Sequence, residues 1–395
     1  YQLLTEGKTI GIFQFESPGM QEYLKKLKPS VFEDMIAMNA LYRPGPLGSN
    51  MVDEFINRKN GIQAIEYLIP ELEPILKETY GVIVYQEQVM RIAGDIGGFK
   101  LSEADNLRKA IGKKKPEIME KFGAKFLEGA QKKHIPIEKA TALYEMMKKF
   151  GEYGFNKSHS ACYALVAYYT AYLKVHYPVE FMAASLSSLM NDAPKVTKYI
   201  EECISSGIRI LPPDVNHSHY PFTVDHHQIR FALGAIKNVG ESAISSLLEA
   251  RGQGQPFTSF FDLVSRTIAG GAVKKNTIEG LVMAGALDQF GNRAQLLASI
   301  DSAIAMAGKL NQRLNSAQTS LFGDGIQSDE GPGIAFELAG CPELPLIEKL
   351  NKEKEFIGFY ISGHPLDKFR FEMSCVTPIA ELDELDREQT FIAGL

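Results

Sequence analysis

The chain has 395 residues, of which 45% are hydrophobic and 23% charged, with 42 Lys and Arg against 48 Asp and Glu. This is the composition of a globular protein, not of a disordered or collagen-like chain, and the length predicts two to four domains. The four cysteines are scattered, with no CxxC pair and no zinc-like Cys/His spacing, which predicts free thiols in a reducing compartment, hence the cytoplasm. We find no signal peptide and no apolar run long enough to span a membrane.

The first half of the chain predicts a series of helices. Apolar residues recur at spacings of three and four in residues 18–27, 51–58, 85–96, 101–111, 116–133 and 137–150. Arg43-Pro44-Gly45-Pro46 and Gly97-Gly98 are predicted breakers between helices. Ser102, with Asp105 in the first turn, is the predicted N-cap of a helix that ends near Gly112.

Positive charge is concentrated in the middle of the chain. Residues 100–160 hold 14 Lys and Arg against 8 Asp and Glu, a net charge of +6, whereas residues 318–395 hold 6 against 15, a net charge of −9. Since the whole chain carries −6, this distribution favours local phosphate binding over binding along the whole surface.

Two basic segments are candidate phosphate sites. The first contains Arg108, Lys109 and the run 113–115, in which arginine would bind phosphate oxygens through its planar fork and lysine as a point charge. A solvated basic helix face is the alternative.

The second basic segment, residues 153–159, opens a long uncharged helix. Lys157, His159 and free amides at the helix N-terminus would attract an anion. Alternatively, Asn156 or Ser158 caps the helix and His159 only packs.

The chain changes character from residue 207 to about 306. Residues 208–211 and 229–233 predict short strands, and helices follow up to about residue 251, around 273–283 and from 292 to about 306. The pattern predicts two helix–hairpin–helix units, whose turns present backbone amides to DNA phosphates. The candidate DNA-binding residues are Lys237, Asn238, Val239, Gly240, Lys274, Lys275, Gly285 and Arg293. The alternative is two hairpins that pack for structural reasons only.

Residues 307–345 are rich in Gly, Ser, Gln and Asn and predict a mobile linker. A short helix is predicted at 348–356, and the chain stops inside an apparent strand. Because it also starts without methionine, we interpret it as a piece of a longer polypeptide.

Five motifs occur in one order and resemble a known family. They are residues 11–20 (GIFQFESPGM), 40–46 (ALYRPGP), 80–88 (YGVIVYQEQ), 107–114 (LRKAIGKK) and 153–159 (YGFNKSH). Together they resemble the fingers region of the bacterial replicative DNA polymerase III alpha subunits, which are C-family polymerases. The resemblance continues through the hairpin region to the end of the chain.

The resemblance implies a mainly α, multidomain fold. It implies a helical fingers domain at 1–206, whose first residues could form the edge of a palm domain, and tandem helix–hairpin–helix units with a few short strands at 207–306. The linker at 307–345 would carry a clamp-binding peptide, and 346–395 would hold a connector and the truncated start of an OB-like β domain.

It also implies roles for the basic segments, because the fingers of the family close over the incoming dNTP. The residues that would bind the nucleotide are Arg43, Arg108, Lys109, Lys113, Lys114, Asn156, Lys157 and His159. Many family members have arginine at the position of Lys109, so the charge persists here but the bidentate fork is lost.

The catalytic carboxylates of the family lie in the palm, upstream of the fingers. The chain contains no DxD sequence, so we expect no catalytic residue and no metal ligand in it, and the Mg²⁺ ligands of the parent enzyme to lie elsewhere. The chain alone is then not expected to polymerise DNA.

The linker segment Gln318-Thr319-Ser320-Leu321-Phe322 resembles the bacterial sliding-clamp-binding pentapeptide. Leu321 and Phe322 would be the apolar anchors, and Gln318 and Ser320 belong to the same predicted contact. A chance apolar pair that packs locally is the alternative.

The resemblance thus predicts part of a DNA-directed DNA polymerase whose partners are template–primer DNA, dNTP, the sliding clamp and other replicase subunits, but no membrane. The rival hypothesis is a non-catalytic helical DNA-binding scaffold. A third, an enzyme that uses His159 as a base, has no accompanying nucleophile or metal constellation, and the chain contains no Walker A loop and no HExxH.

Overall fold

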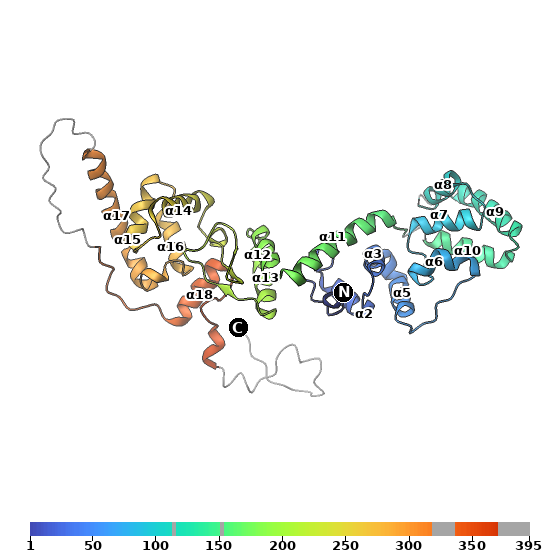
Figure 1. The fold of residues 1–395 in the computed structure, drawn as a ribbon, viewed down its shortest axis with the longest axis horizontal. Helices are drawn as coiled ribbons and strands as arrows, with labels where there is room; N and C mark the ends of the chain where they lie inside the picture. Colours follow the sequence, from blue (N-terminus) through green and yellow to red (C-terminus); the bar gives the residue numbers. More distant parts are fainter. Residues whose placement is uncertain (113–115, 151–153, 318–335, 370–395) are drawn as a thin grey trace. The chain divides into compact units, whose positions relative to one another are not determined.

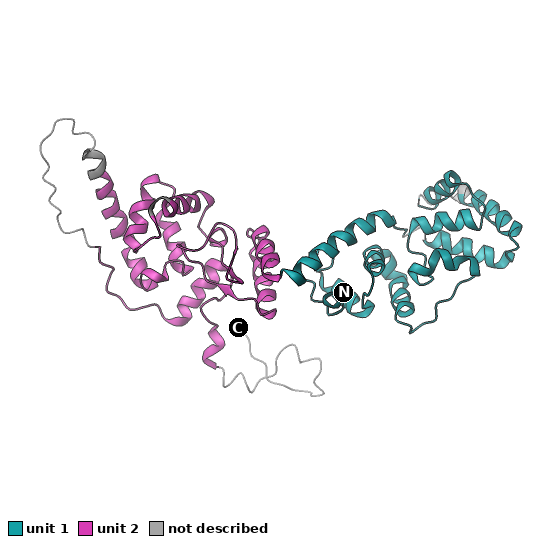
Figure 2. Cartoon of the chain, viewed as in Figure 1, with its two compact units in different colours: residues 1–177 teal, residues 178–395 magenta. Residues whose placement is uncertain are grey.

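The computed structural model describes residues 1–112, 116–150, 154–317 and 336–369. It divides the chain into two compact units, residues 1–177 and 178–395 (Figures 1 and 2). The predicted nucleotide-binding Lys113 and Lys114, the predicted clamp-binding peptide at 318–322 and the apparent strand near the chain end lie outside the described residues.

The first unit is helical. Its α-helices are α1 (Gln2–Thr5), α2 (Pro18–Leu27), α3 (Phe32–Leu41), α4 (Pro44–Gly48), α5 (Met51–Lys59), α6 (Glu73–Leu76), α7 (Gln86–Asp95), α8 (Leu101–Gly112), α9 (Pro116–Lys132), α10 (Ile137–Phe150) and α11 (Lys157–His176). Two 3₁₀ turns, η1 (Pro70–Leu72) and η2 (Lys77–Thr79), flank α6. The six helices predicted from apolar periodicity are confirmed to within one residue at either end.

The predicted break at Arg43-Pro44-Gly45-Pro46 does separate two helices, since α3 ends at Leu41 and Arg43 is extended. The prolines of this segment then start the short helix α4, because proline is compatible with the first turn of a helix. One local prediction in the first unit is wrong. Ser102 is not an N-cap, because α8 already begins at Leu101. The Glu103 carboxylate accepts a 3.0 Å hydrogen bond from the Lys100 amide and so satisfies a donor at the start of this helix.

The first unit has two apolar clusters. One is formed by α2, α3, α5 and the small residues Ala164, Ala167 and Ala171 of α11, which let α11 lie close against α3. The other is formed by α7 to α10 around Ile92, Leu107 and other buried side chains. A parallel bridge between Tyr85 and Phe155 joins the start of α7 to the segment before α11, so the two predicted motifs around these residues are neighbours.

The second unit combines helices with a small sheet. Its α-helices are α12 (Pro178–Ser188), α13 (Ala193–Ser205), α14 (Glu241–Gly254), α15 (Phe260–Thr267), α16 (Lys275–Met283), α17 (Arg293–Ala317) and α18 (Leu346–Ile357). The 3₁₀ turns are η3 (Leu233–Ala235), η4 (Ile268–Gly270), η5 (Asp288–Phe290) and η6 (Pro365–Phe369). Strands β1 (Ile210–Leu211), β2 (Thr223–Asp225) and β3 (Gln228–Arg230) have the order β1-β3-β2, with β3 parallel to β1 and antiparallel to β2.

The prediction of a mainly α chain with a few short strands is confirmed, but several boundaries differ. Neither β2 nor α15 was predicted. Helix α17 runs to Ala317, so the segment expected as linker from residue 307 begins as helix. Helices α12 and α13, expected within the domain that ends at residue 206, lie in the second unit, where α12 packs against β2 and the Ser187 hydroxyl donates to the Phe222 carbonyl.

Among the described helices, none combines the length and the apolar character needed to cross a membrane.

Candidate functional site

The N-terminal turn of α7 is held rigidly by the buried side chain of Gln88. Its Oε1 accepts hydrogen bonds from the amides of Val84 and Tyr85 at 2.8 and 2.9 Å, and its Nε2 donates to the Thr79 hydroxyl at 2.8 Å. Because a buried amide is costly when unpaired, these bonds determine how the chain enters α7. They therefore position the two side chains before Gln88, those of Gln86 and Glu87.

Gln86 connects the two basic segments. Its Nε2 donates to the Gly154 carbonyl at 2.9 Å, and its Oε1 accepts from Nη1 of Arg108 at 2.9 Å. Its backbone amide donates to the Phe155 carbonyl at 2.9 Å. One side chain thus brings α8 and the segment before α11 to the same place.

Asp105 orients both cations of α8. Nε and Nη2 of Arg108 lie 3.0 and 2.8 Å from one carboxylate oxygen, and the Lys109 ammonium lies 2.7 Å from the other. Hydrogen bonds from Lys109 and then from Arg108 lower the pKa of Asp105 below its usual value. Arg108 is 29% exposed and Lys109 is 55% exposed, so a ligand in solvent can reach both.

Asn156 is the N-cap of α11, as one of the two alternatives predicted. Its Oδ1 accepts the His159 amide at 2.8 Å, and its Nδ2 donates to Glu87 at 3.0 Å. The Lys157 amide donates to both Glu87 oxygens, at 3.1 and 3.0 Å. The expectation of free amides at residues 157 and 159 is therefore wrong. The N-terminus of a helix attracts an anion, and here the carboxylate of Glu87 is that anion.

The Lys157 ammonium lies 2.7 Å from a Glu78 oxygen and 5.5 Å from the centre of the Tyr85 ring. Burial, and then the neighbouring carboxylates beginning with Glu78, raise the pKa of Tyr85. The Lys157–Glu78 pair is about one-third exposed on each side, and pairs of this kind contribute only about 0–1 kcal/mol. A stronger anion can therefore displace Glu78 from Lys157.

Phe155 contacts the remaining two candidates, Arg43 and His159. The guanidinium carbon of Arg43 lies 4.2 Å from the centre of the Phe155 ring, and its Nε donates to the Ala40 carbonyl at 2.7 Å. Burial lowers the pKa of Arg43. The His159 ring lies 5.4 Å from that of Phe155 and 4.4 Å from that of Tyr163, which forms an aromatic surface at the start of α11.

The structure thus brings together the described members of the predicted nucleotide set, through residues to which the predictions gave no part in nucleotide binding. Those residues are Glu78, Gln86, Glu87 and Asp105. Gln86 and Glu87 stand in the YGVIVYQEQ motif, directly after an apolar run, and polar side chains in that position are a signal that could have identified them.

The turn before α14 is the first candidate DNA contact. Asn238 has φ of 68°, the left-handed conformation, and is exposed. Two neighbouring segments hold the turn in place. The Lys237 amide donates to the Phe356 carbonyl at 2.9 Å. Gly280 packs against the Lys237 carbonyl so closely that a Cβ on Gly280 would lie only 2.8 Å from it. Gly240 faces open space, so a phosphate could approach the backbone there.

In the second hairpin, Lys274 is exposed and Lys275 pairs with Asp301 at 2.7 Å. Gly285 has φ of 81°, and a Cβ there would collide with the side chain of Arg293. The turn therefore requires glycine.

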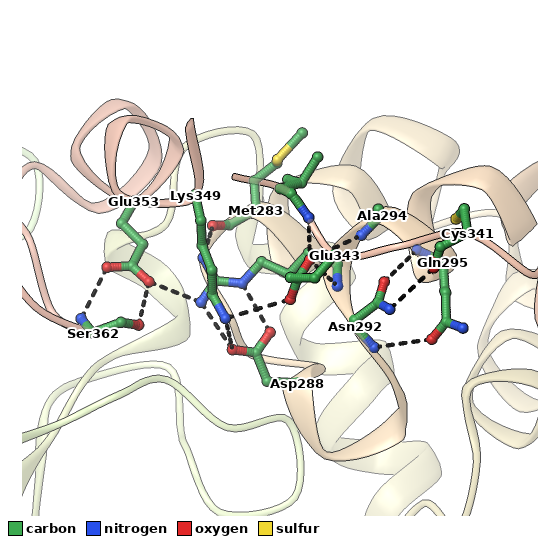
Figure 3. A network of polar contacts seen from close by, with 12 residues as sticks. Met283, Asp288, Asn292, Ala294, Gln295, Cys341, Glu343, Lys349, Glu353 and Ser362 are labelled. Carbon is green, nitrogen blue, oxygen red and sulfur yellow. Dashed lines mark hydrogen bonds and ion pairs between the residues drawn. The ribbon is translucent and has the colours of Figure 1, made fainter. Parts of the chain in front are cut away.

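Arg293 has a structural role instead of the predicted DNA contact. Its guanidinium is 1% exposed and donates to Asp288 at 2.9 Å, to Glu353 at 2.8 Å and to the Met283 carbonyl at 3.2 Å. Figure 3 shows Asp288 and Glu353 on either side of this network, with Ser362 beyond Glu353. A phosphate cannot reach a guanidinium that is enclosed in this way, so Arg293 leaves the candidate DNA-binding set.

Within the described ranges, no group of three or more His, Cys, Asp or Glu side chains is arranged to hold a metal ion. The residues that surround Lys157 and Arg108 hold cations of the protein itself, not a divalent ion.

Comparison with known proteins identifies what the chain is related to. Residues 1–134 match the bacterial DNA polymerase III alpha subunit finger domain, and residues 207–296 match a helix–hairpin–helix motif. Over its whole length, the chain is 44% identical to the DNA polymerase III subunit alpha of Vibrio cholerae serotype O1 and covers 35% of that protein. Over 98% of its length it is 45% identical to the same subunit of Aquifex aeolicus, of which it covers 32%. Over 95% of its length it is 44% identical to the subunit of Bacillus subtilis, of which it covers 33%. The chain spans about a third of the length of these curated relatives, and the predicted resemblance is confirmed.

Proposed function

We propose that this chain, a relative of the bacterial DNA polymerase III alpha subunits, is the part of a DNA-directed DNA polymerase that binds the incoming dNTP and the template–primer duplex. The observation that carries the proposal is the convergence on Gln86, which bonds to Arg108 and to the Gly154 carbonyl at 2.9 Å each. It gives two distant basic segments one common position, as a triphosphate site requires.

The charges in the first unit suit a triphosphate. Lys109 is exposed, Arg108 and Lys157 are partly exposed, and each ammonium or guanidinium pairs with one carboxylate; partly exposed pairs of this kind contribute only about 0–1 kcal/mol each. A hydrogen bond to a charged phosphate oxygen contributes about 1.5–3 kcal/mol, so a triphosphate replaces the carboxylates with net gain. Lys113 and Lys114 follow α8 in sequence and would add further positive charge.

We also propose a place for the nucleotide base. His159 and Tyr163 have rings 4.4 Å apart on α11, next to the cations, and aromatic rings of this kind stack on bases. Arg43 packs against the Phe155 ring, with its guanidinium carbon 4.2 Å from the ring centre.

In the second unit, the exposed turn at Asn238 and Gly240 would contact the phosphates of the duplex, with Lys237 directly before it in sequence and Lys274 and Lys275 in the second hairpin. Contacts of this kind give affinity that depends on salt and not on base sequence. The segment at Gln318, Ser320, Leu321 and Phe322 would dock to the sliding clamp.

Phosphoryl transfer by a polymerase requires Mg²⁺ held by clustered carboxylates. The described residues do not fit that requirement, so no catalytic step is assigned to them. The ions, the other replicase subunits and a cytoplasmic location belong to the proposal for the whole polymerase.

The dNTP assignment is tested with Arg108→Ala and Lys157→Ala in the full-length polymerase. Each should raise the KM for dNTP about tenfold, since the loss of one charged contact of about 1.4 kcal/mol is a factor of ten. Duplex affinity should change little. Lys132→Ala is the matched control, because Lys132 is an exposed lysine of the same unit, paired with Glu128 at 2.7 Å.

Unchanged dNTP kinetics in both variants would refute the assignment and favour the non-catalytic DNA-binding scaffold. The clamp proposal has its own test: replacing Leu321 and Phe322 by alanine should abolish capture of the clamp in a pull-down, and undiminished capture would contradict it.

A further inference from the structure

The first unit contains a pocket that does not include the cations of the proposed nucleotide site. It has a volume of about 220 Å³ and lies between α5, the segment that leads into η1, residues 81–83 and the end of α10. Its wall is mainly apolar, with Leu68, Leu72, Val82 and Ile83 among the lining residues, and Met146 of α10, also in the lining, is 43% exposed. Apolar pockets bind organic molecules, and this one is smaller than the roughly 300–1,000 Å³ typical of drug-sized ligands, so it suits a small one.

The charges of the lining balance. Arg58 and Lys149 are positive, and Glu54 and Glu66 are negative. Arg58 already forms an ion pair with Glu54 and donates to the Tyr80 carbonyl at 3.3 Å. A neutral ligand leaves these contacts in place, and the balanced lining gives no preference for a ligand of either charge.

One residue, Phe150, lines this pocket and also the small pocket beside Arg108 and Gly154. Phe150 is 5% exposed and packs closely: a Cβ on Gly154 would lie 2.9 Å from its ring and 3.2 Å from Cγ of Gln86. Since a packed interior transmits displacement and does not absorb it, a shift of the Phe150 ring reaches Gly154 and Gln86.

We propose that the pocket lined by Met146 and Phe150 binds a neutral, mainly apolar small molecule, and that its occupation shifts Gly154 through the Phe150 ring. The effect on the nucleotide rests on the proposed function, but the binding and the shift do not. A ligand that moves Gly154 also moves its partner Gln86, which orients Arg108, and therefore weakens nucleotide binding.

The sequence offers a direct assay. Tyr80–Gly81 and Tyr153–Gly154 are its only two Tyr–Gly pairs. Labelling tyrosine with ¹³C at the carbonyl and glycine with ¹⁵N therefore gives two signals in a carbonyl-filtered amide spectrum. Gly81 reports on the pocket and Gly154 on the proposed nucleotide site, and Tyr80→Phe identifies the Gly81 signal because it removes the ¹³C label before it.

The probe is 2-naphthol, titrated into the intact chain. Both signals should shift with one common saturation curve. Met146→Trp, which places a larger side chain in the lining of the pocket, should weaken binding at least tenfold. Met119→Trp on α9, with the same new side chain elsewhere in the unit, should leave it unchanged. An unchanged thermal midpoint shows that each variant is folded.

Three results would overturn the proposal: no saturable shift at Gly81, a shift at Gly81 with none at Gly154, or equal binding by the two tryptophan variants. A separate titration with dATP tests the proposed function alone, since failure of dATP to shift Gly154 counts against that function and not against the pocket. In the full-length polymerase, saturating 2-naphthol should raise the KM for dNTP at least threefold, and the Met146→Trp enzyme should not respond.

Discussion

Replacing Arg293 by leucine should destabilise the second unit by about 3 kcal/mol, although a surface arginine that contacts DNA would cost almost nothing. The guanidinium is 1% exposed and Glu353 is 0% exposed, so the variant leaves a buried carboxylate without its cation. Removal of one partner of a buried ion pair costs about 3–5 kcal/mol.

The lower end of that range applies here for two reasons. Glu353 keeps other donors, since its oxygens accept the amides of Ile361 and Ser362 at 3.1 and 2.9 Å and the Ser362 hydroxyl. Asp288, the second partner of Arg293, is 39% exposed and becomes solvated at little cost. Arg293→Lys keeps the charge but loses the planar fork, and should cost about 1–2 kcal/mol.

The assay uses the absence of tryptophan from the chain. Phe359→Trp places a single fluorophore near Phe231, whose ring centre lies 5.7 Å from that of Phe359. Urea unfolding followed by its fluorescence then reports on the second unit alone. A local probe is needed because a chain of two units does not unfold as one two-state system.

A double variant sharpens the test. Glu353→Gln removes the charge and keeps one acceptor oxygen. The combination with Arg293→Leu should therefore be more stable than the sum of the single effects by about 1 kcal/mol or more. Additive effects, or a loss below about 1 kcal/mol for Arg293→Leu, would refute the interpretation of Arg293 as a buried structural ion.

Three further outcomes follow from the first unit. Gln86→Ala removes the link to Arg108 and should raise the KM for dNTP three- to tenfold in steady-state kinetics. Gln86→Glu is the comparison variant, because it keeps an oxygen that can accept from Arg108. Wild-type kinetics in Gln86→Ala would contradict the positioning role of Gln86. Glu78→Gln frees Lys157 from its carboxylate and should lower the KM several-fold, whereas a higher KM would show that Glu78 assists binding. Burial raises the pKa of Tyr144 from 10.0 to about 12, so the folded state holds this proton more tightly; stability present below pH 10 is lost as the pH rises toward 12. Tyr144→Phe should lose that part of the pH dependence in urea midpoints, and identical profiles for both proteins would exclude the effect.

The helices of the first unit were predictable because their signal is local. Apolar residues at the helical period located α7, α8 and α10 to within a residue of the structure. Short elements were less predictable, since β2 has three residues and α15 eight, too few to establish a period. Helix α17 was expected to stop near residue 306 because its continuation is rich in polar residues, yet it runs to Ala317.

The candidate site divides in the same way. The two basic segments stand out in the sequence as local concentrations of charge, and Asn156 was one of two predicted caps. Their meeting at Gln86 could not be predicted, because the bonds from its side chain join residues 22 and 68 positions away.

By itself, therefore, the amino-acid sequence determined where the helices form and which segments concentrate positive charge, since both depend on residues within a few positions of each other. The tertiary structure alone decided which cations remain accessible to a ligand. Lys157 meets Glu78 in an exposed pair, whereas Arg293 is enclosed by Asp288 and Glu353. In the sequence, both are basic residues near the start of a predicted helix. Their accessibility differs in the structure because burial and the choice of partner depend on elements far apart along the chain.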